Sequence, residues 1–488
     1  MAVMTLPLRG VFAAALLAAF VLSGCASTRG LQPALTPDDT DSLAVSDSFG
    51  GNTFSVAAWP TQDFWRAWGD PQLDALIAEA LMGTPGLDAA DARVRKAEAQ
   101  AGLADDARKP HLSANLQYSG AYLPETLLPA PYGGDYWGVE LATLNFRYAP
   151  DLWGGKRAHW EAAVDSLHAI EVDAQQARLL LAGNIARTYL DLAQAHESHQ
   201  VAIAETARAQ RLLTLATQRV RAGIDNQSQM RQAESIVASA TQQAEAAQQR
   251  IGLLRNAIAA LLGQGPDRGL RIEAPSLLPV EAPALPSTLP SELLGHRPDV
   301  VAARWRVEAA ARNIDAGKAD FYPSLNLTAM VGLAAGRLSD LFTRDAAAAL
   351  GGPALSLPIF DGPRLRGQLA GNNADYDLAV AQYDQTLVAA VREVADALQS
   401  ARTLDKQISA VAQARDAARK AWSLADSRYR AGLGTQLDVL AAQRPLLQLD
   451  QLSVALQAQR RIATVDLAVA IGGGMSPTSP TSSFSGSP

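Results

Sequence analysis

Arg221-Ala222-Gly223 recurs about 210 residues later as Arg430-Ala431-Gly432 in this chain of 488 residues. Two other pairs of segments share nearly the same displacement. Lys109-Pro110-His111-Leu112-Ser113 matches Tyr322-Pro323-Ser324-Leu325-Asn326, and Ala92-Arg93-Val94-Arg95 matches Ala303-Arg304-Trp305-Arg306. Because the three matches occur in the same order, the sequence predicts a tandem duplication of one structural unit.

Each copy is predicted to contain a helix, two strands and a long helical hairpin. Alternation of apolar and polar residues indicates strands near 111–122 and 136–148 in the first copy, and near 323–333 and 354–360 in the second. In the first of these strands the apolar residues occupy even positions and the polar residues odd positions. This pattern predicts a sheet with two chemically different faces.

A helical stretch of about 65 residues follows each strand pair, because apolar residues such as Leu181 and Ile185 recur at spacings of three and four. The two stretches run from Gly155 to Arg219 and from Pro363 to Arg428. At about 1.5 Å per residue, each would be roughly 100 Å long. A single globular core does not need helices of this length, so we expect them to pack side by side in an extended coiled assembly.

The repeated Arg-Ala-Gly segments are predicted to end these long helices. Glycine can adopt the left-handed conformation that closes a helix, and a second long helix follows each of them. We therefore expect the hairpin tips at Gly223 to Gln229 and at Gly432 to Leu437.

Composition marks the boundaries between these parts. Prolines from Pro275 to Pro290 fix backbone angles and remove amide donors, which predicts a linker. The expected order is a first repeat at 61–264, a Pro-rich linker at 265–290 and a second repeat at 291–471. A tail at 472–488 is rich in Gly, Ser, Thr and Pro and is predicted to be disordered.

The N-terminus resembles the signal of an exported lipoprotein. Arg9 precedes an apolar run, Val11 to Leu22, that is too short to span a bilayer. The run ends in Leu22-Ser23-Gly24-Cys25, which is similar to a lipobox, where the signal is cut before an acylated cysteine. Cys25 is also the only cysteine, so no intramolecular disulfide can form.

These features predict a signal peptide at 1–24 and a lipid-anchored segment at 25–60, with palmitate on Cys25. No aspartate follows the cysteine, so delivery to the outer membrane is expected. The alternative is an ordinary cleaved signal with an incidental cysteine.

Charge and hydropathy restrict the function classes. The net charge of -7 and the pI near 5.5 provide no basic surface for nucleic acid. No segment after the signal has the roughly 18 to 20 apolar residues of a transmembrane helix, so a membrane crossing has to use strands.

Four strands cannot close a barrel, because single-chain bacterial barrels begin at about eight strands and open edges are costly in hydrocarbon. The chain is therefore predicted to pool its strands with symmetry-related copies. A soluble sheet packed on helices remains the alternative.

Catalytic patterns are weak. His196 and His199 have a spacing that could hold a metal on a helix, but no third ligand lies nearby in sequence, and a solvated helix face is the simpler interpretation. We find no nucleophile elbow, P-loop or dinucleotide fingerprint. The sequence predicts no enzyme activity, no cofactor and no metal site.

Several motifs in fixed order resemble the TolC and OprM type of outer-membrane efflux proteins, in the lipoprotein branch called NodT-like. In chain order these are Phe64-Trp65-Arg66-Ala67-Trp68-Gly69-Asp70-Pro71-Gln72-Leu73, Asp151-Leu152-Trp153-Gly154, Arg297-Pro298-Asp299, Phe321-Tyr322-Pro323-Ser324-Leu325, Pro358-Ile359-Phe360 and Leu437-Asp438-Val439-Leu440. The resemblance covers essentially the whole mature chain.

The resemblance implies an α+β membrane protein that forms a homotrimer. A twelve-stranded β-barrel in the outer membrane would be continued by a twelve-helix α-barrel in the periplasm, with the N-terminal segment, the linker and the C-terminal segment forming an equatorial belt. The implied function is the passive exit channel of a tripartite efflux pump for drugs or other small amphiphiles. The implied partners are a periplasmic adaptor (membrane fusion protein), an inner-membrane pump of RND or MFS type, and outer-membrane lipid. An outlet for type I protein secretion and a non-conducting scaffold lipoprotein are the alternatives.

The resemblance also suggests the gate residues. In relatives the hairpin tips close the periplasmic end, and Tyr429 and Asp438 match a tyrosine and an aspartate of that gate. Three copies of Asp438 around an axis would favour cations at the mouth. Arg444 matches an arginine common in the OprM branch, and Gln229 stands where TolC has an acid that pairs with the tyrosine.

These matches leave alternatives open. A hydrogen bond between Tyr429 and Gln229 is one option for the gate. The alternative to a gate role for Asp438 is that it is a solvated or helix-capping acid. The exposed tips, with Arg221, Gly223, Arg430 and Gly432, resemble the adaptor-docking surface, although these residues could serve only to end the helices.

Overall fold

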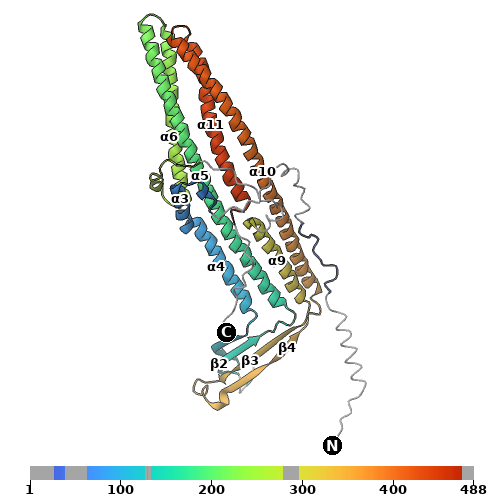
Figure 1. Cartoon of the computed structure of the whole chain (residues 1–488). Helices are drawn as coiled ribbons and strands as arrows, with labels where there is room; N and C mark the ends of the chain where they lie inside the picture. The colour runs from blue at the N-terminus through green and yellow to red at the C-terminus, as the bar shows by residue number, and fades with distance from the viewer. Residues whose placement is uncertain (1–26, 39–62, 127–128, 130–132, 279–295, 475–488) are drawn as a thin grey trace. The chain divides into compact units, whose positions relative to one another are not determined.

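The computed structural model describes residues 27–38, 63–126, 129, 133–278 and 296–474 (Figure 1). The predicted signal peptide, Cys25, most of the N-terminal segment, the second half of the linker and most of the tail lie outside these residues. The chain divides into two compact units. The strand unit comprises Met1–Pro37, Val94–Ile170 and Ala303–Asp384, and the hairpin unit comprises Asp38–Arg93, Glu171–Ala302 and Gln385–Pro488.

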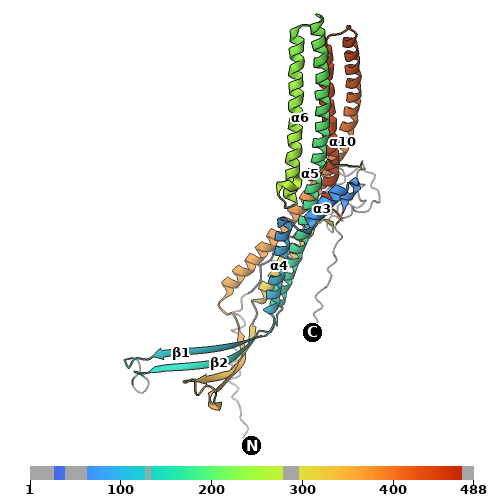
Figure 2. The same cartoon turned by 90° about the vertical axis from the view of Figure 1, so that its left-hand side faces the viewer.

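The strand unit contains one antiparallel sheet in the order β1-β2-β3-β4. The predicted first copy contains β1 (His111–Tyr122) and β2 (Tyr136–Tyr148), and the predicted second copy contains β3 (Ser324–Ala335) and β4 (Ala347–Ser356). Figure 2 shows β1 and β2 running side by side as a long hairpin. Pairing of β2 with β3 joins the two copies into one sheet and leaves one edge of β1 and one edge of β4 unpaired within the chain.

The register aligns a continuous set of apolar residues from all four strands on one face, while the other face carries the polar residues of β1 together with further apolar residues of β2, β3 and β4. Leu144 lies between Ala114 of β1 and Val331 of β3, and Val331 in turn lies opposite Ala349 of β4. On the other face Asn115, Thr143 and Gly332 are aligned. The alternation predicted in the first and third strands therefore forms a common apolar face. Its large exposed side chains are Leu112, Leu116, Tyr118, Tyr122, Tyr136, Leu144, Phe146, Val331 and Leu355.

The predicted bounds of the fourth strand were wrong. We expected residues 354–360, but β4 spans Ala347–Ser356, so Pro358-Ile359-Phe360 follows the strand. The sequence AAALGGPALS has little polar alternation and contains Pro353, and both features are unusual for a strand. Backbone pairing with β3 defines β4, and the edge of a sheet tolerates the missing amide of a proline.

Helices pack against one another within the strand unit. Residues of α4 (Pro85–Asp106) pack Ala97 and Ala101 against Leu167 of α5 (Gly155–Arg221). A second cluster contains Ile314 of α9 (Pro298–Ala319), Phe321 just after that helix, and Leu365 and Leu369 of α10 (Gly362–Arg430). The small residues Ala97 and Ala101 let α4 and α5 approach closely.

The N-terminal residues after the predicted lipid site run along α10 in the strand unit. The carboxylate of Asp377 accepts hydrogen bonds from the backbone N–H groups of Ala34 (2.9 Å) and Leu35 (2.9 Å). Arg366 donates to the carbonyl oxygen of Ser27, and Leu31 packs on the α9–α10 cluster.

In the hairpin unit, α5 pairs with α6 (Gln227–Leu261) and α10 pairs with α11 (Gln436–Ala470). Both views show each pair running side by side (Figures 1 and 2). The observed long helices of 67 and 69 residues extend slightly beyond the predicted ends. Gly223 (φ 71°) and Gly432 (φ 76°) are left-handed, as predicted.

A buried polar network centred on Asp70 lies in the hairpin unit. Asp70 caps α3 (Pro71–Met82) by accepting from the Gln72 N–H at 2.9 Å. Its other carboxylate oxygen accepts from the Tyr189 hydroxyl of α5 and from the Ser276 N–H, both at 2.8 Å. Burial raises the pKa of Tyr189, so the phenol stays a donor. Asp70 thus attaches the first half of the linker, which begins with the short α7 (Pro266–Gly269), to α3 and α5.

The core of the hairpin unit surrounds this network. It combines Trp68 of the short 3-10 helix η2 (Phe64–Trp68) with Leu73, Ile185, Ile258 and Val465 from four other helices. None of the helices in the described part of the chain has the length and apolarity needed to cross a bilayer.

Candidate functional site

The two hairpin tips are built by the same capping chemistry. Asn226 accepts a hydrogen bond from the Gln229 N–H at 3.2 Å, and Gln229 accepts from the Asn226 N–H at 2.9 Å. Thr435 and Asp438 repeat this reciprocal capping box at the start of α11. The tip loops are consequently shorter than predicted, because α6 begins at Gln227 and α11 begins at Gln436.

Asp438 is exposed and acts as the capping acid at its own helix. One carboxylate oxygen accepts from the N–H and from the hydroxyl of Thr435, both at 2.8 Å. The hydrogen bond from the Thr435 backbone, together with that from its hydroxyl, lowers the pKa of Asp438. The carboxylate is therefore ionised at neutral pH, and the capping role left open by the sequence is present in the single chain.

Tyr429 pairs with Asp225, and this corrects the sequence interpretation. Its hydroxyl donates to Asp225 Oδ2 at 2.9 Å, while Gln229 is engaged in the capping box. Asp225 also forms an ion pair with Arg219 at 2.9 Å, and the guanidinium of Arg219 lies 4.5 Å from the centroid of the Tyr429 ring. The first-copy tip therefore has an acid that the alignment of Gln229 with the family position overlooked.

These three residues form one electrostatic unit, which we call the tip latch (Arg219, Asp225 and Tyr429). The hydrogen bond from Arg219 lowers the pKa of Asp225, and the bond from Tyr429 acts in the same direction. Burial raises the pKa of Tyr429 to about 12, and the contact with Asp225 adds to this rise. An ionised carboxylate and a neutral phenol thus stay paired across the neutral pH range.

Apolar packing supports the latch. Tyr429 is fully buried against Leu212 of α5 and Val439 of α11, with Trp422 partly buried beside them. The cluster joins α5 of the first repeat to α10 and α11 of the second repeat in the same chain. Separating the two tips therefore has to expose apolar surface as well as break the latch.

A second polar contact lies farther along α5 and was not found from the sequence. Glu205 is buried, accepts from the side-chain amide of Gln443, and lies 3.1 Å from Arg208. Asp450 of α11 accepts from Arg415 of α10 at 2.5 Å. Burial raises the pKa of Glu205. The signal for these contacts in the sequence is weak, because it consists of charged residues on helix faces that are otherwise small and apolar.

The other predicted tip residues are exposed. Arg444 lies on the surface of α11, and Arg221, Gly223 and Gly432 are exposed at the turns, while Arg430 forms an ion pair with Asp426 at 2.8 Å. Exposed leucine and isoleucine side chains, which the sequence did not indicate, lie at the same tips. These are Ile224, Leu433 and Leu437.

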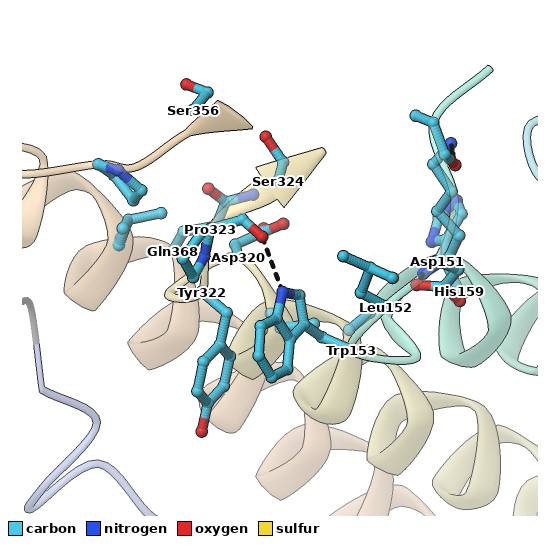
Figure 3. A pocket seen from close by; sticks show the side chains of 18 of the residues that line it. Asp151, Leu152, Trp153, His159, Asp320, Tyr322, Pro323, Ser324, Ser356 and Gln368 are labelled. Atoms are coloured by element: carbon cyan, nitrogen blue, oxygen red, sulfur yellow. Dashed lines mark hydrogen bonds between the residues drawn. The ribbon is translucent and has the colours of Figure 1, made fainter. Parts of the chain in front are cut away.

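A cleft of about 1100 Å³ lies at the base of the strands within the strand unit. Figure 3 shows Trp153 beside Tyr322, and the two rings stack with centroids 4.8 Å apart. The indole N–H of Trp153 donates to the Pro323 carbonyl at 2.7 Å. Asp151 caps α5 by accepting from the Arg157 N–H at 2.7 Å. These motif residues brace the two copies where β2 ends and β3 begins.

This geometry consists of contacts between helices and a two-faced sheet. Among the described residues no three His, Cys, Asp or Glu side chains are grouped closely enough to hold a metal ion. The model of the family described as outer membrane efflux protein matches residues 76–264 and 289–473, which is most of the chain. The chain belongs to the outer membrane efflux protein family.

Similar proteins agree with this membership of the outer membrane efflux protein family. The fusaric acid resistance protein FusA of Burkholderia cepacia is 38% identical over 373 residues, which cover 75% of this chain and 70% of that protein. The crystal structure of the outer membrane protein VceC from Vibrio cholerae is 36% identical, covers 85% of this chain and 100% of its own, and has a TM-score of 0.80. The outer-membrane channel OprN is 25% identical, with a TM-score of 0.81 and coverage of 91% and 98%.

The resemblance drawn from the motifs is therefore confirmed. This member of the outer membrane efflux protein family belongs to the outer membrane, functions in efflux and shares its fold with channels rather than with enzymes.

Proposed function

We propose that three copies of this chain form the exit channel of a tripartite efflux pump. The observation that carries the proposal is the four-stranded sheet, with one apolar face and two edges unpaired within the chain. Unpaired strand edges are unfavourable in a bilayer, so the edges of β1 and β4 need partners from other copies. Three copies supply twelve strands, enough for a closed barrel. The tandem duplication explains how one chain supplies two strand hairpins and two helical hairpins.

The aromatic residues of the apolar face support its contact with lipid. Tyr118, Tyr122 and Tyr136 lie toward the β1–β2 turn, and Phe146 and Tyr148 lie at the opposite end of β2. Twelve residues at about 3.4 Å span about 40 Å, and a tilt of about 40° reduces this to about 30 Å across the membrane. This height suits an apolar band about 25 Å tall between two aromatic girdles.

The hairpin unit supplies the periplasmic part in this proposal. Three copies of α5, α6, α10 and α11 would form a twelve-helix tunnel, with the tip latch and the ring of Asp438 at its mouth. The exposed tips, with Arg221, Gly223, Arg430 and Gly432, would dock a periplasmic adaptor. An inner-membrane pump of RND or MFS type would provide the energy, because a passive channel has none.

The cargo of the proposed channel is small amphiphilic compounds. Support comes from the relative named for fusaric acid resistance, a small-molecule phenotype. Type I protein secretion is the alternative within the same architecture, and a non-conducting scaffold is the alternative outside it. The polar second face of the strands favours conduction, because a scaffold needs no polar lumen.

Lipid attachment at Cys25 would anchor each copy to the outer membrane. A Cys25→Ser variant should no longer incorporate labelled palmitate, whereas wild-type protein should. Continued labelling of the variant would refute the assignment.

Recordings in planar bilayers test the channel itself. Cross-linked trimers of wild-type protein are expected to show small or infrequent openings, and Tyr429→Phe trimers larger or more frequent ones. Trimers that never conduct, even with Tyr429→Phe, would show that the protein is a scaffold.

A further inference from the structure

The strands contain very few charged residues, and two of them lie at one point on the polar face. Across β1 to β4 the acidic, basic and histidine side chains are those of His111, Glu140 and Arg147. Glu140 is aligned with Ala335 on the apolar face. His111 and Arg147 are direct cross-strand partners on the polar face, next to Thr328 of β3.

Arg147 is exposed, and the part of the chain that the structure describes provides no ion pair for it. Acids that flank β1 and β2 in the sequence have their own contacts. Asp151 accepts from backbone N–H groups at the start of α5, and Asp105 forms an ion pair with Lys109 at 2.5 Å. Asp106 lies 3.8 Å from His111. No ion pair within the described residues therefore neutralises the guanidinium, which lies at the end of β2 that adjoins α5.

We propose that Arg147 forms a cationic ring that selects organic anions. The inference rests on the proposed trimeric barrel, in which the apolar face meets lipid and the polar face lines the lumen. Three copies of Arg147 would then surround the pore where the barrel joins the helices. A like-charged ring between low-dielectric walls raises the local concentration of counter-ions and repels co-ions.

The residues beyond the ring determine which kind of solute the polar face would favour. From Arg147 toward the β1–β2 turn, the polar face first presents amide and hydroxyl side chains such as Asn145, Asn115 and Thr143. It then becomes apolar along β2, at Leu141, Val139 and Trp137. A solute with one carboxylate and an apolar body would meet a complementary cation first and apolar surface afterwards. The geometry therefore favours amphiphilic carboxylates over neutral or cationic compounds of the same size.

Reversal potentials across a potassium chloride gradient test the ring. Trimers of Tyr429→Phe are the reference, because their open tips allow current to be measured. Adding Arg147→Gln should lower the chloride-to-potassium permeability ratio by about threefold or more, and Arg147→Glu should lower it further. Arg147→Lys should keep the ratio of the reference. Arg337→Gln, which removes an arginine from the β3–β4 connection, should also leave it unchanged.

A measurement without substitution at Arg147 guards against a folding defect. Benzoate added on the barrel side of the reference channel should reduce the chloride current, and benzyl alcohol at the same concentration should not. Failure of every trimer to conduct would refute the proposed channel. Conduction with an unchanged permeability ratio in Arg147→Gln, or equal effects of benzoate and benzyl alcohol, would refute only the cationic ring.

Discussion

Asp225 joins two hairpin tips whose residues lie 204 positions apart in sequence. It accepts one hydrogen bond from Tyr429 and a second from Arg219, and its ionised state is favoured by both. An aspartate in a short turn is usually interpreted as a local turn residue, because its side chain can bond to its own backbone. Here the carboxylate bonds to side chains of α5 and α10 instead.

Removing the tip hydroxyl should loosen the closed tip. Tyr429→Phe deletes the bond to Asp225, and its loss is expected to cost about 1 kcal/mol. Asp225→Asn should have the larger effect, because it also weakens the ion pair with Arg219. Single-channel open probability is the measurement. Gln229→Ala is the control, since it removes a helix cap without touching the latch, and an equal effect of Gln229→Ala would argue against the latch.

The latch should also determine how the closed tip responds to pH. Asp225 has a lowered pKa, so its contribution is complete above the ordinary value of 3.8 and is lost as the pH falls through the lower value of the folded tip. Tyr429 has a raised pKa, so its contribution is lost only as the pH rises through about 12. Open probability of wild-type trimers should therefore be constant between about pH 5 and 9. A transition inside that window, retained in Asp225→Asn, would exclude the latch as its cause.

At the scale of elements, the helices were predictable and the fourth strand was not. The long helices follow from apolar spacing and from the repeated Arg-Ala-Gly turns, whose glycines are left-handed as expected. Capping boxes at Asn226 and Thr435 determine where α6 and α11 begin. The resemblance to the family assigned Gln229 and Asp438 to the gate, and these capping boxes were not identified. Strand β4 depends on pairing with β3 rather than on its own composition.

Loss of a helix cap should have a local effect. Thr435→Ala removes the side chain that accepts from the Asp438 N–H, and such caps contribute about 1 kcal/mol. Hydrogen exchange should speed up in the first turn of α11 and remain unchanged in α6. Thr403→Ala, in the middle of α10, is the matched control and should change exchange in neither helix. Uniform acceleration over both hairpins would contradict a local cap.

At the scale of the whole molecule, the two faces of the sheet should respond differently to charge. Leu116 is 79% exposed on the apolar face, and its neighbour Gln117 lies on the polar face. A lysine at a lipid-facing site near the bilayer midplane costs about 2 to 4 kcal/mol. Leu116→Lys should therefore reduce the amount of trimer in outer-membrane fractions, while Gln117→Lys should be tolerated. Native gels and membrane fractionation measure both, and equal tolerance of the two variants would mean that the faces are not divided between lipid and lumen.

The sequence by itself predicted the repeat and determined the strand alternation, the long helices and the family, because these depend on periodicity and on motifs that are local in the chain. Only the tertiary structure decided which residues meet across the repeat. The partner of Tyr429 and the limits of β4 depend on packing and backbone pairing between segments far apart in sequence. The alignment of Arg147 with His111 depends on the register of a hairpin, and periodicity alone leaves that register undefined.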